Sequence, residues 1–586
     1  MIPPREVFRE AGGPGKNILS KKPAKPDAGR FAMNFRPPQP PRHSAAAPAP
    51  FALALAALAA GALFLAACAS RETPVERGNR EQILHRGAGP ELASLDPHLA
   101  TGTTEHNILS ALLEGLVAED PKTLDPVADG VAEKWDVSPD GLTYTFTLRA
   151  SARWSNGQPV TAHDFVASYR RVLTPALGAD YAPLLYVIKN AEAWHKGRAA
   201  DFAAVGLAAP DARTLRVTLE HPTPRFLSML THTAFMPVHI PSIERHGPVD
   251  SRATPWARPG RFVGNGPFNL AEWRPGQKIT ATKSPTYWDS ARVSLREIHF
   301  YFTENRETEE RAFRTGQLHL TEALPPGKIE TYRENAPALL RIDPYLGTEF
   351  YRVNTARPFL NDHRVRRALA LSIDRAAITE KILRGGQLPA RAFTPPGTDG
   401  YTSAAWMPDA PDAARRLLAE AGYPGGRGAP PVELLFNTSE SHRAVAEAVQ
   451  EMWRRELGLD ARLVNQENKV AQDARRAGQY ELIRSAWIAD YIDPLTFLGV
   501  WTAGSGNNYT GWSDPAYDQT LFQAARTESP AARAALLQRA EAILLDAAPF
   551  IPIYHYTHVF LIQPSVKNWH PTLLDHHPYK HVRLEP

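Results

Sequence analysis

Apolar and polar positions follow two different periods along this chain, and segments of the two kinds occur in mixed order. Residues 142–148 (LTYTFTL) alternate with period two and are rich in β-branched and aromatic side chains, so they predict a strand. Two further segments also predict strands: 214–219 (TLRVTL) and 432–437 (VELLFN). Strands separated by helical patterns at this spacing indicate an α/β architecture with more than one sheet.

Helical periodicity fills several of the segments between these strands. Thr161 and Asp164 precede the pattern FVASYRRVL, which predicts a helix with a capping residue at its start. Residues 442–457 predict a long amphipathic helix that Gly458 ends. The remaining predicted helices are two stretches within 362–382 (VRRALALSI and RAAITEKIL) and the segment 412–421, ended by Gly422 and Pro424.

The N-terminal region contains an uncharged run of mostly Ala and Leu, residues 51–67, directly before Cys68. Arg36 and Arg42 precede the run, and this order of basic, apolar and small residues is typical of a signal peptide. A run of about 17 residues is also the shortest that spans a membrane, so a membrane helix is the alternative. Residues 1–32 fit no signal peptide, which favours Met33 as the true start.

The segment Leu65-Ala66-Ala67-Cys68 resembles the bacterial lipobox. The resemblance implies that Cys68 is lipidated and becomes the new N-terminus, with residues 1–68 as the leader. Residues 69–80 are polar, and we expect them to form a tether.

The net charge of the whole chain is +4, but the basic excess lies in the leader. Residues 1–68 hold nine Lys/Arg and three Asp/Glu, which leaves 57 basic and 59 acidic residues in the remainder. A body with a slight negative balance has no electrostatic footprint for nucleic acid, so we expect no nucleic-acid partner.

Motifs for catalysis or metal binding are not found in the sequence. It contains no HExxH helix, no GxSxG elbow and no P-loop, and a single cysteine excludes an internal disulfide and a Cys-rich zinc site. His555 and His558 lie on a strand-like segment whose alternation places them on opposite faces. The clustered histidines near the C-terminus are expected to be solvated: His570, His576, His577 and His581. We therefore expect no metal, no cofactor and no enzyme.

An ordered set of short segments carries a family resemblance from about residue 83 to the C-terminus. The segments include Ser94-Leu95-Asp96-Pro97-His98, Gly130-Val131-Ala132-Glu133-Lys134-Trp135, Asn265-Gly266-Pro267-Phe268, Tyr287-Trp288-Asp289, Asn361-Asp362 with Val365-Arg366, and Ala486-Trp487-Ile488-Ala489-Asp490-Tyr491. Together they resemble the oligopeptide-binding proteins of ABC transporters, the family 5 extracellular solute-binding proteins.

The resemblance implies an α/β fold of two lobes joined by a hinge, of the periplasmic-binding-protein type II, with an additional inserted domain. Carried onto this chain, the first lobe uses residues 81–104, 229–346 and 558–586. The extra domain is 105–228, and the second lobe is 347–557.

The resemblance also implies a set of ligand-binding residues. Asp490 matches the aspartate that holds the peptide ammonium through a charge-assisted hydrogen bond. Cationic residues at matching positions meet the ligand's carboxylate: Arg475, Arg484 and His442. Backbone groups come from Ala486 and Ile488 and from Glu91, Leu92 and Ala93 of the opposite lobe. Aromatic side chains at matching positions line the cleft: Trp487, Tyr345 and Tyr556.

Three positions depart from the family pattern. Gly347 and Ile488 stand where well-known members have a cysteine pair, so no disulfide staples the lobe there. Leu383, with Arg384 beside it, stands where we expect a lysine, and Phe350 replaces a tyrosine. These departures leave ligand length and C-terminal preference open.

The function implied is capture of short peptides for an ABC importer by a monomeric, lipid-anchored protein of the periplasm or cell envelope. Closure of the lobes would select the liganded state for docking on the permease subunits. A receptor for murein peptides, haem or metal chelates is the alternative within the same fold. A periplasmic hydrolase is the remote alternative, because the sequence offers it neither a nucleophile nor a metal set.

Overall fold

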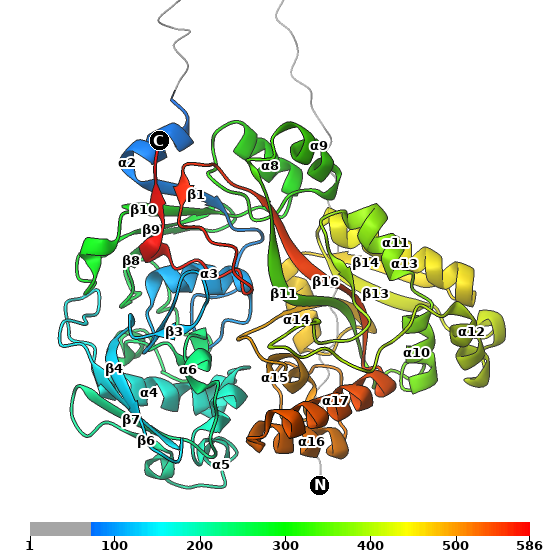
Figure 1. The fold of residues 1–586 in the computed structure, drawn as a ribbon, viewed down its shortest axis with the longest axis horizontal. Coiled ribbons are helices and arrows are strands. Elements are labelled where there is room, and N and C mark those ends of the chain that lie inside the picture. The colour runs from blue at the N-terminus through cyan, green and yellow to red at the C-terminus, as the bar shows by residue number, and fades with distance from the viewer. Residues whose placement is uncertain (1–71) are drawn as a thin grey trace, which may run out of the picture. The chain divides into compact units, whose positions relative to one another are not determined.

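A computed structural model describes residues 72–586, which form one compact unit (Figure 1). Its strands lie in one six-stranded sheet, two four-stranded sheets and two short hairpins. Helices pack against these sheets, as the mixed pattern of the sequence predicts. The leader, Cys68 and the predicted start at Met33 lie outside the described residues.

The six-stranded sheet has the order β12-β16-β11-β15-β13-β14. Its strands are β11 (Leu340–Val353), β12 (Leu388–Pro389), β13 (Val432–Asn437), β14 (Ala461–Gln466), β15 (Leu482–Ile488) and β16 (Phe550–Leu561). The associated helices are α10 (His363–Leu371), α11 (Arg375–Ala377), α12 (Pro411–Glu420), α13 (Glu440–Leu457), α14 (Asn468–Arg476), α15 (Leu495–Leu498), α16 (Pro515–Arg526) and α17 (Pro530–Ala547). These elements enclose one large apolar core that includes Phe350, Trp453 and Trp501.

A second core is built from both ends of the described chain. Its sheet has the order β1-β10-β9-β8, with β1 (Ile83–Gly87), β8 (Phe268–Arg274), β9 (Lys278–Lys283) and β10 (Glu297–Tyr301). Around it lie α2 (Pro74–Glu81), α3 (Thr103–Leu112), α7 (Ile240–Glu244), α8 (Arg306–Arg314), α9 (Ile329–Asn335) and the hairpin of β17 (Val566–Lys567) and β18 (Arg583–Leu584). Residues from the far C-terminus, such as Trp569 and Tyr579, complete this core.

The third core belongs to the sheet β4-β5-β7-β6. Its strands are β4 (Ala132–Val137), β5 (Thr143–Leu148), β6 (Leu207–Ala208) and β7 (Thr214–Thr218), joined by α4 (Ala162–Leu173), α5 (Ala191–His195) and α6 (Phe226–Met229). The hairpin of β2 (Ala118–Glu119) and β3 (Pro126–Val127) precedes them. Most residues of this core belong to the segment 105–228, but Leu99, Phe235 and Tyr491 lie outside it.

Helix α3 shows where a domain boundary taken from a resemblance is imprecise. The predicted boundary at residue 105 assigns most of α3 to the extra domain, yet Ile108, Leu109 and Leu112 pack in the second core. A single helix sequence does not reveal which of two neighbouring cores it covers. The other predicted boundaries remain predictions.

Two long antiparallel strands connect the cores. β16 contributes Phe550 and Ile553 to the large core and Phe560 to the second core. β11 pairs with β16 along most of its length, with register shifts between Pro344 and Thr348. Figure 1 shows β11 and β16 running side by side between the two groups of sheets.

The elements predicted from periodicity are confirmed. β5, β7 and β13 occupy the three predicted strands, and α4, α10, α12 and α13 occupy predicted helices. Thr161 and Asp164 form a capping box at the start of α4. The second helix predicted within 362–382 is α11, which continues as one turn of π-helix to Leu383.

The expected tether is wrong over most of its length. Residues 74–81 form helix α2, whose N-terminus is closed by a capping box of Thr73 and Glu76. Val75 is buried, and its N–H donates to the carbonyl of Gly316 at 3.0 Å. A polar composition does not prevent a capped helix from forming when one apolar face has a core to cover.

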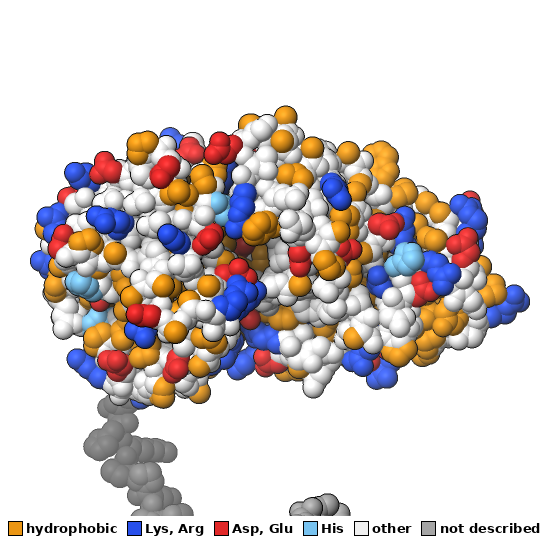
Figure 2. All heavy atoms as spheres, turned by 90° about the horizontal axis from the view of Figure 1, so that it is seen from below, with side chains coloured by type: hydrophobic (Ala, Val, Ile, Leu, Met, Phe, Trp, Pro, Cys, Tyr) orange, Lys and Arg blue, Asp and Glu red, His pale blue; other side chains and the backbone are white. Residues whose placement is uncertain are grey.

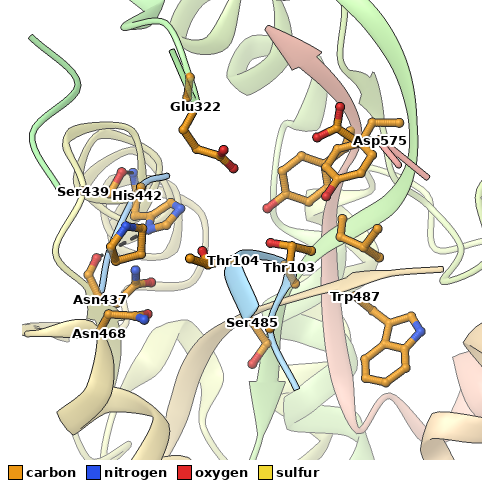
Figure 3. Close-up of a pocket in the computed structure, with 18 of the residues that line it drawn as sticks. Thr103, Thr104, Glu322, Asn437, Ser439, His442, Asn468, Ser485, Trp487 and Asp575 are labelled. Carbon is orange, nitrogen blue, oxygen red and sulfur yellow. Dashed lines mark hydrogen bonds between the residues drawn. The ribbon is translucent and has the colours of Figure 1, made fainter. Parts of the chain in front are cut away.

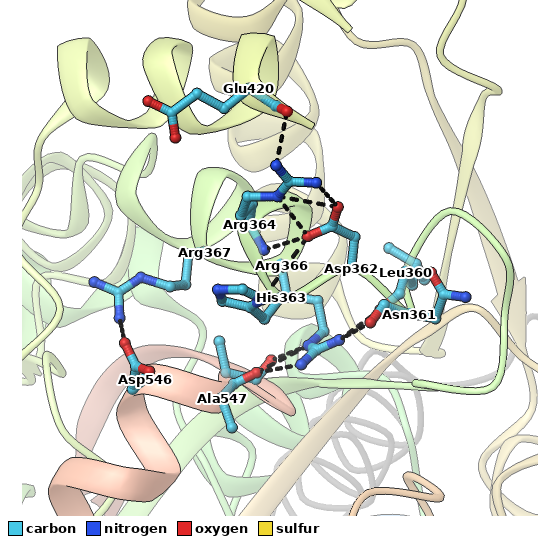
Figure 4. A network of polar contacts seen from close by, with 11 residues as sticks. Leu360, Asn361, Asp362, His363, Arg364, Arg366, Arg367, Glu420, Asp546 and Ala547 are labelled. Carbon is cyan, nitrogen blue, oxygen red and sulfur yellow. Dashed lines mark hydrogen bonds and ion pairs between the residues drawn. The ribbon is translucent and has the colours of Figure 1, made fainter. Parts of the chain in front are cut away.

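The structure shows what Asp362 and Arg366 do in the segment Asn361-Asp362 with Val365-Arg366 (Figure 4). Asp362 caps α10 and holds Arg364 at 2.6 Å, while Arg366 points inward. The Arg366 guanidinium donates to the carbonyls of Leu360, Asn361, Ala547 and Ala548 at 2.5–3.1 Å. It therefore satisfies the last carbonyls of α17, where a cation also matches the helix dipole.

Within residues 72–586, no helix has the length and apolar character needed to cross a membrane.

Candidate functional site

A cavity of about 430 Å³ lies where segments of the three cores meet. Figure 3 shows Thr103 and Thr104 of α3, Trp487 of β15, Glu322 and Asp575 around it, with His442 on a neighbouring wall. Peptide-sized ligands occupy cavities of this order.

The predicted ligand residues, apart from Ala93, line this cavity: Glu91, Leu92, Tyr345, His442, Arg475, Arg484, Ala486, Trp487, Ile488, Asp490 and Tyr556. The N–H of Ala93 instead donates to the Glu105 carboxylate at 2.9 Å, so it is not available to a ligand. The Glu91 carboxylate is likewise engaged, since it accepts from the indole of Trp273 at 3.0 Å. Their roles in binding remain predictions.

The Asp490 carboxylate is buried and receives only uncharged hydrogen bonds. Tyr181 donates its hydroxyl to Oδ1 at 3.0 Å, and Thr496 donates to Oδ2 at 2.9 Å. His232 lies 3.5 Å from Oδ1, but burial lowers the pKa of His232 to about 3, so its ring is neutral. Burial raises the pKa of Asp490 to about 7. No Lys or Arg of the described chain pairs with this carboxylate.

Strand β15 presents an edge with no strand partner to the cavity. On one side β11 pairs with it from Leu482 to Ile488. On the other side β13 pairs with Leu482 and Ile483 only. Within the described residues, the edge from Arg484 to Ile488 therefore has no neighbouring strand, and its residues line the cavity. Such an edge accepts an extended peptide by main-chain pairing.

Arg484 is already paired within the protein. Its Nε lies 2.6 Å from Oε1 of Glu349, its second amino group contacts Oε2, and it also donates to the Tyr556 hydroxyl at 2.6 Å. Glu349 is opposite Ala486 in the β11–β15 register, so Arg484 is its diagonal neighbour. The carboxylate neutralises the charge that Arg484 was expected to offer a ligand.

The two other predicted cations differ from each other. The pKa of His442 lies well below its usual range, because the ring is buried and Arg484 and Arg306 are near, so His442 is neutral. Arg475 retains its charge, and its buried Nε has no hydrogen-bond partner in residues 72–586. The Arg475 guanidinium lies 5.1 Å from the centre of the Tyr509 ring. Of the three expected cations, Arg475 alone is both charged and unpaired by a carboxylate.

The expectation of solvated C-terminal histidines is wrong for two of the four. His577 is buried and lies 2.7 Å from Asp575, and His576 lies 2.9 Å from Glu119. Asp575 also pairs with His558 at 2.9 Å, which raises the pKa of His558 to about 9. The segment folds back over the second core, which a local pattern of polar residues does not reveal. In residues 72–586 no group of three His, Cys, Asp or Glu is arranged to hold a metal ion.

Several cavity residues were missed in the sequence. Tyr181 reaches Asp490 from the third core, and Arg352 and Tyr509 line the wall near Arg475. A signal for Glu349 and Arg352 was their position beside aromatic and apolar residues at the end of β11, where charged side chains need partners.

Comparison with known proteins places this architecture. Residues 127–509 match the family described as "Bacterial extracellular solute-binding proteins, family 5 Middle". The chain belongs to this family. The family 5 chain is 35% identical over 522 residues to the periplasmic oligopeptide-binding protein OppA of Escherichia coli, covering 87% of this chain and 93% of OppA. It is 36% identical over 497 residues to the periplasmic murein peptide-binding protein MppA of the same organism, covering 83% and 90%.

Solved structures show that the fold is the two-lobe α/β fold of these binding proteins. The murein tripeptide binding protein MppA of E. coli superposes with a TM-score of 0.81, covering 86% of this chain and 98% of that one, at 35% identity. Haemophilus influenzae OppA in complex with RPPGFSPFR gives 0.81 at 33% identity, covering 86% and 99%. The unliganded open form of MppA gives only 0.58 at 36% identity, covering 86% and 97%. The family 5 chain is therefore arranged differently from that open form.

Proposed function

We propose that this protein captures short peptides in its cavity and delivers them to an ABC importer. The Asp490 carboxylate would hold the peptide ammonium, and the free edge of β15 would pair with the peptide backbone. The carboxylate end of the peptide would lie toward the cationic side chains. OppA and MppA are named for binding oligopeptides and murein peptides, which supports this class of ligand.

The unpaired, buried carboxylate of Asp490 is the observation that carries the proposal. Removing a carboxylate from water costs several kcal/mol, and no Lys or Arg of residues 72–586 pairs with Asp490 to offset that cost. The charge of His576 lowers the pKa of Asp490 less than burial raises it, and His576 is itself paired with Glu119 at 2.9 Å. A peptide ammonium offsets the cost with charge-assisted hydrogen bonds. A ligand whose N-terminus is acetylated has no ammonium charge there, so it does not offset the free-energy cost of burying the Asp490 carboxylate.

The test is native mass spectrometry of the protein with di- to pentapeptides, each supplied with a free and with an acetylated N-terminus. Murein tripeptide is included because it also has a free ammonium. We expect capture of the free forms only. If neither form is captured, the protein is not a peptide receptor, and any co-purified mass identifies a ligand of another class, such as haem or a metal chelate.

The proposal includes no catalytic step. The relatives that the chain matches are binding proteins, and the cavity wall supplies a recognition surface of charged and aromatic side chains. The body carries both charge signs over its surface, and Figure 2 shows them interspersed on one face. We propose that the protein acts as a monomer that docks transiently on permease subunits.

The same proposal places the protein in the periplasm, held to a membrane by a lipid on Cys68. The relatives OppA and MppA are periplasmic, and the lipobox-like segment supplies the attachment chemistry. Cys68→Ser should move the protein from the membrane fraction to the soluble fraction of cells. Retention in the membrane fraction would instead identify residues 51–67 as a membrane helix.

A further inference from the structure

A group of buried, unpartnered donors lies at one place in the cavity wall. Arg352 Nε, Arg475 Nε and the hydroxyl of Tyr509 are all shielded from solvent and have no hydrogen-bond partner in residues 72–586. All three residues line the cavity. Buried donors in folded proteins are nearly always satisfied, so three together indicate that a ligand or its water completes the site.

The charge balance at this place is positive. Arg352 is 1% exposed and has no carboxylate partner; it donates to the carbonyls of Asn507 and Asn508 and lies over the rings of Phe350, Trp501 and Tyr509. Arg475 approaches the same Tyr509 ring at 5.1 Å, against 5.6 Å for Arg352.

Within residues 72–586, no carboxylate forms an ion pair with Arg352 or Arg475. Asp180 lies 3.7 Å from Nε of Arg476, the residue next to Arg475. Arg476 also contacts Asp473 at 3.5 Å, so the nearby carboxylates pair with Arg476 and leave the guanidinium groups of Arg352 and Arg475 without a counter-ion. Uncompensated buried charge is costly, and a ligand that brings a negative charge removes that cost.

The backbone at Tyr509 is held in an unfavourable conformation that positions its ring. Tyr509 has φ +53°, in the left-handed region that bulky residues rarely adopt. Its carbonyl accepts the Tyr480 hydroxyl at 2.5 Å, which fixes this conformation. Strained residues of this kind concentrate at binding sites, where the surrounding structure holds them.

We infer that Arg352, Arg475 and Tyr509 form a subsite for a side-chain carboxylate near the N-terminal end of the bound peptide. The inference rests on the proposed function and deepens it, because it assigns Arg475 to a side chain instead of the peptide C-terminus. Two guanidinium groups and one phenol suit a carboxylate, which accepts several hydrogen bonds at once.

The position of the subsite favours a residue close to the ammonium. Tyr181 donates to Asp490 at 3.0 Å, and the preceding residue, Asp180, lies 3.7 Å from Arg476, the residue next to Arg475. The subsite thus lies beside the ammonium anchor. An extended peptide advances about 3.3–3.6 Å per residue, so the C-terminal carboxylate of a tripeptide or longer ligand lies farther along the cavity.

Calorimetry with matched peptides tests the inference on the full-length protein. The pairs are Asp-Ala-Ala with Asn-Ala-Ala, and Ala-Glu-Ala with Ala-Gln-Ala, each also with an amidated C-terminus. We expect the acidic member of at least one pair to bind tenfold or more tightly, with and without amidation. Equal binding within both pairs overturns the inference but leaves peptide capture intact, whereas no binding of any peptide overturns the proposed function itself.

Variants of cavity residues test which side chains cause the preference for acidic peptides. Arg475→Gln should reduce the acid-to-amide ratio to about one, and Arg475→Lys, which keeps the charge, should retain part of it. Arg306→Gln is the matched control, since Arg306 also lines the cavity but contributes to the surroundings of His442 and Glu309 instead. Its acid-to-amide ratio should stay unchanged. If Arg475→Gln weakens acidic and amide peptides equally and only amidation matters, Arg475 binds the peptide C-terminus and the inference is wrong.

Discussion

The hydroxyl of Tyr181 donates a 3.0 Å hydrogen bond to the carboxylate of Asp490, although 309 residues separate them in the chain. Tyr181 belongs to the third core and Asp490 follows strand β15 of the large sheet. The candidate anchor for a ligand is therefore completed by the segment that the sequence marks only as an insertion.

Asp490 and Tyr181 should contribute unequally to peptide affinity. Asp490→Asn removes the charge that pairs with the ammonium, and we expect binding to weaken by about 100-fold, equivalent to about 2.7 kcal/mol. Tyr181→Phe removes one neutral hydrogen bond and should weaken binding by about three- to tenfold. Calorimetry with a free tripeptide measures both. Thr496→Val, which removes the other side-chain donor to Asp490, should behave like Tyr181→Phe; unchanged affinity in Asp490→Asn would exclude the anchor role.

Peptide affinity should rise with pH up to about 7. The pKa of Asp490 in the free protein is about 7, raised by burial, and a bound ammonium lowers it, so binding below pH 7 must release a proton. Affinity then falls by about tenfold for each pH unit below 7. Above about pH 8 it falls again, because the peptide's own ammonium loses its proton. Titration calorimetry from pH 5 to 9 follows both limbs.

The Asp490→Asn variant is the control for that profile. It should lose the acidic limb and retain the alkaline limb, because the peptide ammonium still titrates. An acidic limb that persists in the variant would belong to another group, such as Glu309, whose pKa is about 7 through burial in the same cavity wall.

Breaking the Glu349–Arg484 pair should destabilise the fold. The side chains are 3% and 16% exposed, so Glu349→Gln leaves a largely buried guanidinium without its counter-ion. We expect a loss of about 2–4 kcal/mol in the free energy of unfolding, measured by urea denaturation. Replacing both residues by Leu should recover much of that loss, since an apolar pair carries no unpaired charge. Full stability in Glu349→Gln would mean that Tyr556 alone satisfies Arg484.

Arg366 should matter far more than its neighbour Arg367. Arg366→Met leaves the last carbonyls of α17 without donors in a buried place, and we expect a loss of about 2–3 kcal/mol in urea unfolding. Arg367 pairs with Asp546, whose side chain is 75% exposed, so Arg367→Met should change stability by less than about 0.5 kcal/mol. Equal effects of the two variants would contradict the capping role.

The sequence predicted individual helices and strands and the residues of the cavity wall better than it predicted which charged side chains pair with each other. Strands such as β13 and helices such as α13 follow from local periodicity, and motifs placed Asp490 and Trp487 in the cavity wall. Whether a cation is free depends on a partner from another segment. Arg484 is neutralised by Glu349 across the sheet, and Arg475 is not, although the two arginines look equivalent in the sequence.

The same limit applies to the C-terminal histidines. The sequence predicts that His576 and His577 are solvated, but the partner of His576 is Glu119, which becomes its neighbour only when the chain end packs on the second core. Burial of a chain terminus depends on tertiary contacts, so it cannot be predicted from the residues next to it in the sequence.

The length of the unpartnered edge of β15 limits how many peptide residues can pair with it through their main chain. Between the end of its pairing with β13 at Ile483 and the end of the strand at Ile488 there are five residues, and a strand advances about 3.4 Å per residue. A pentapeptide would occupy the whole unpartnered edge. Any longer peptide must leave the sheet before its C-terminus, and its remaining residues would be held by side chains and water alone.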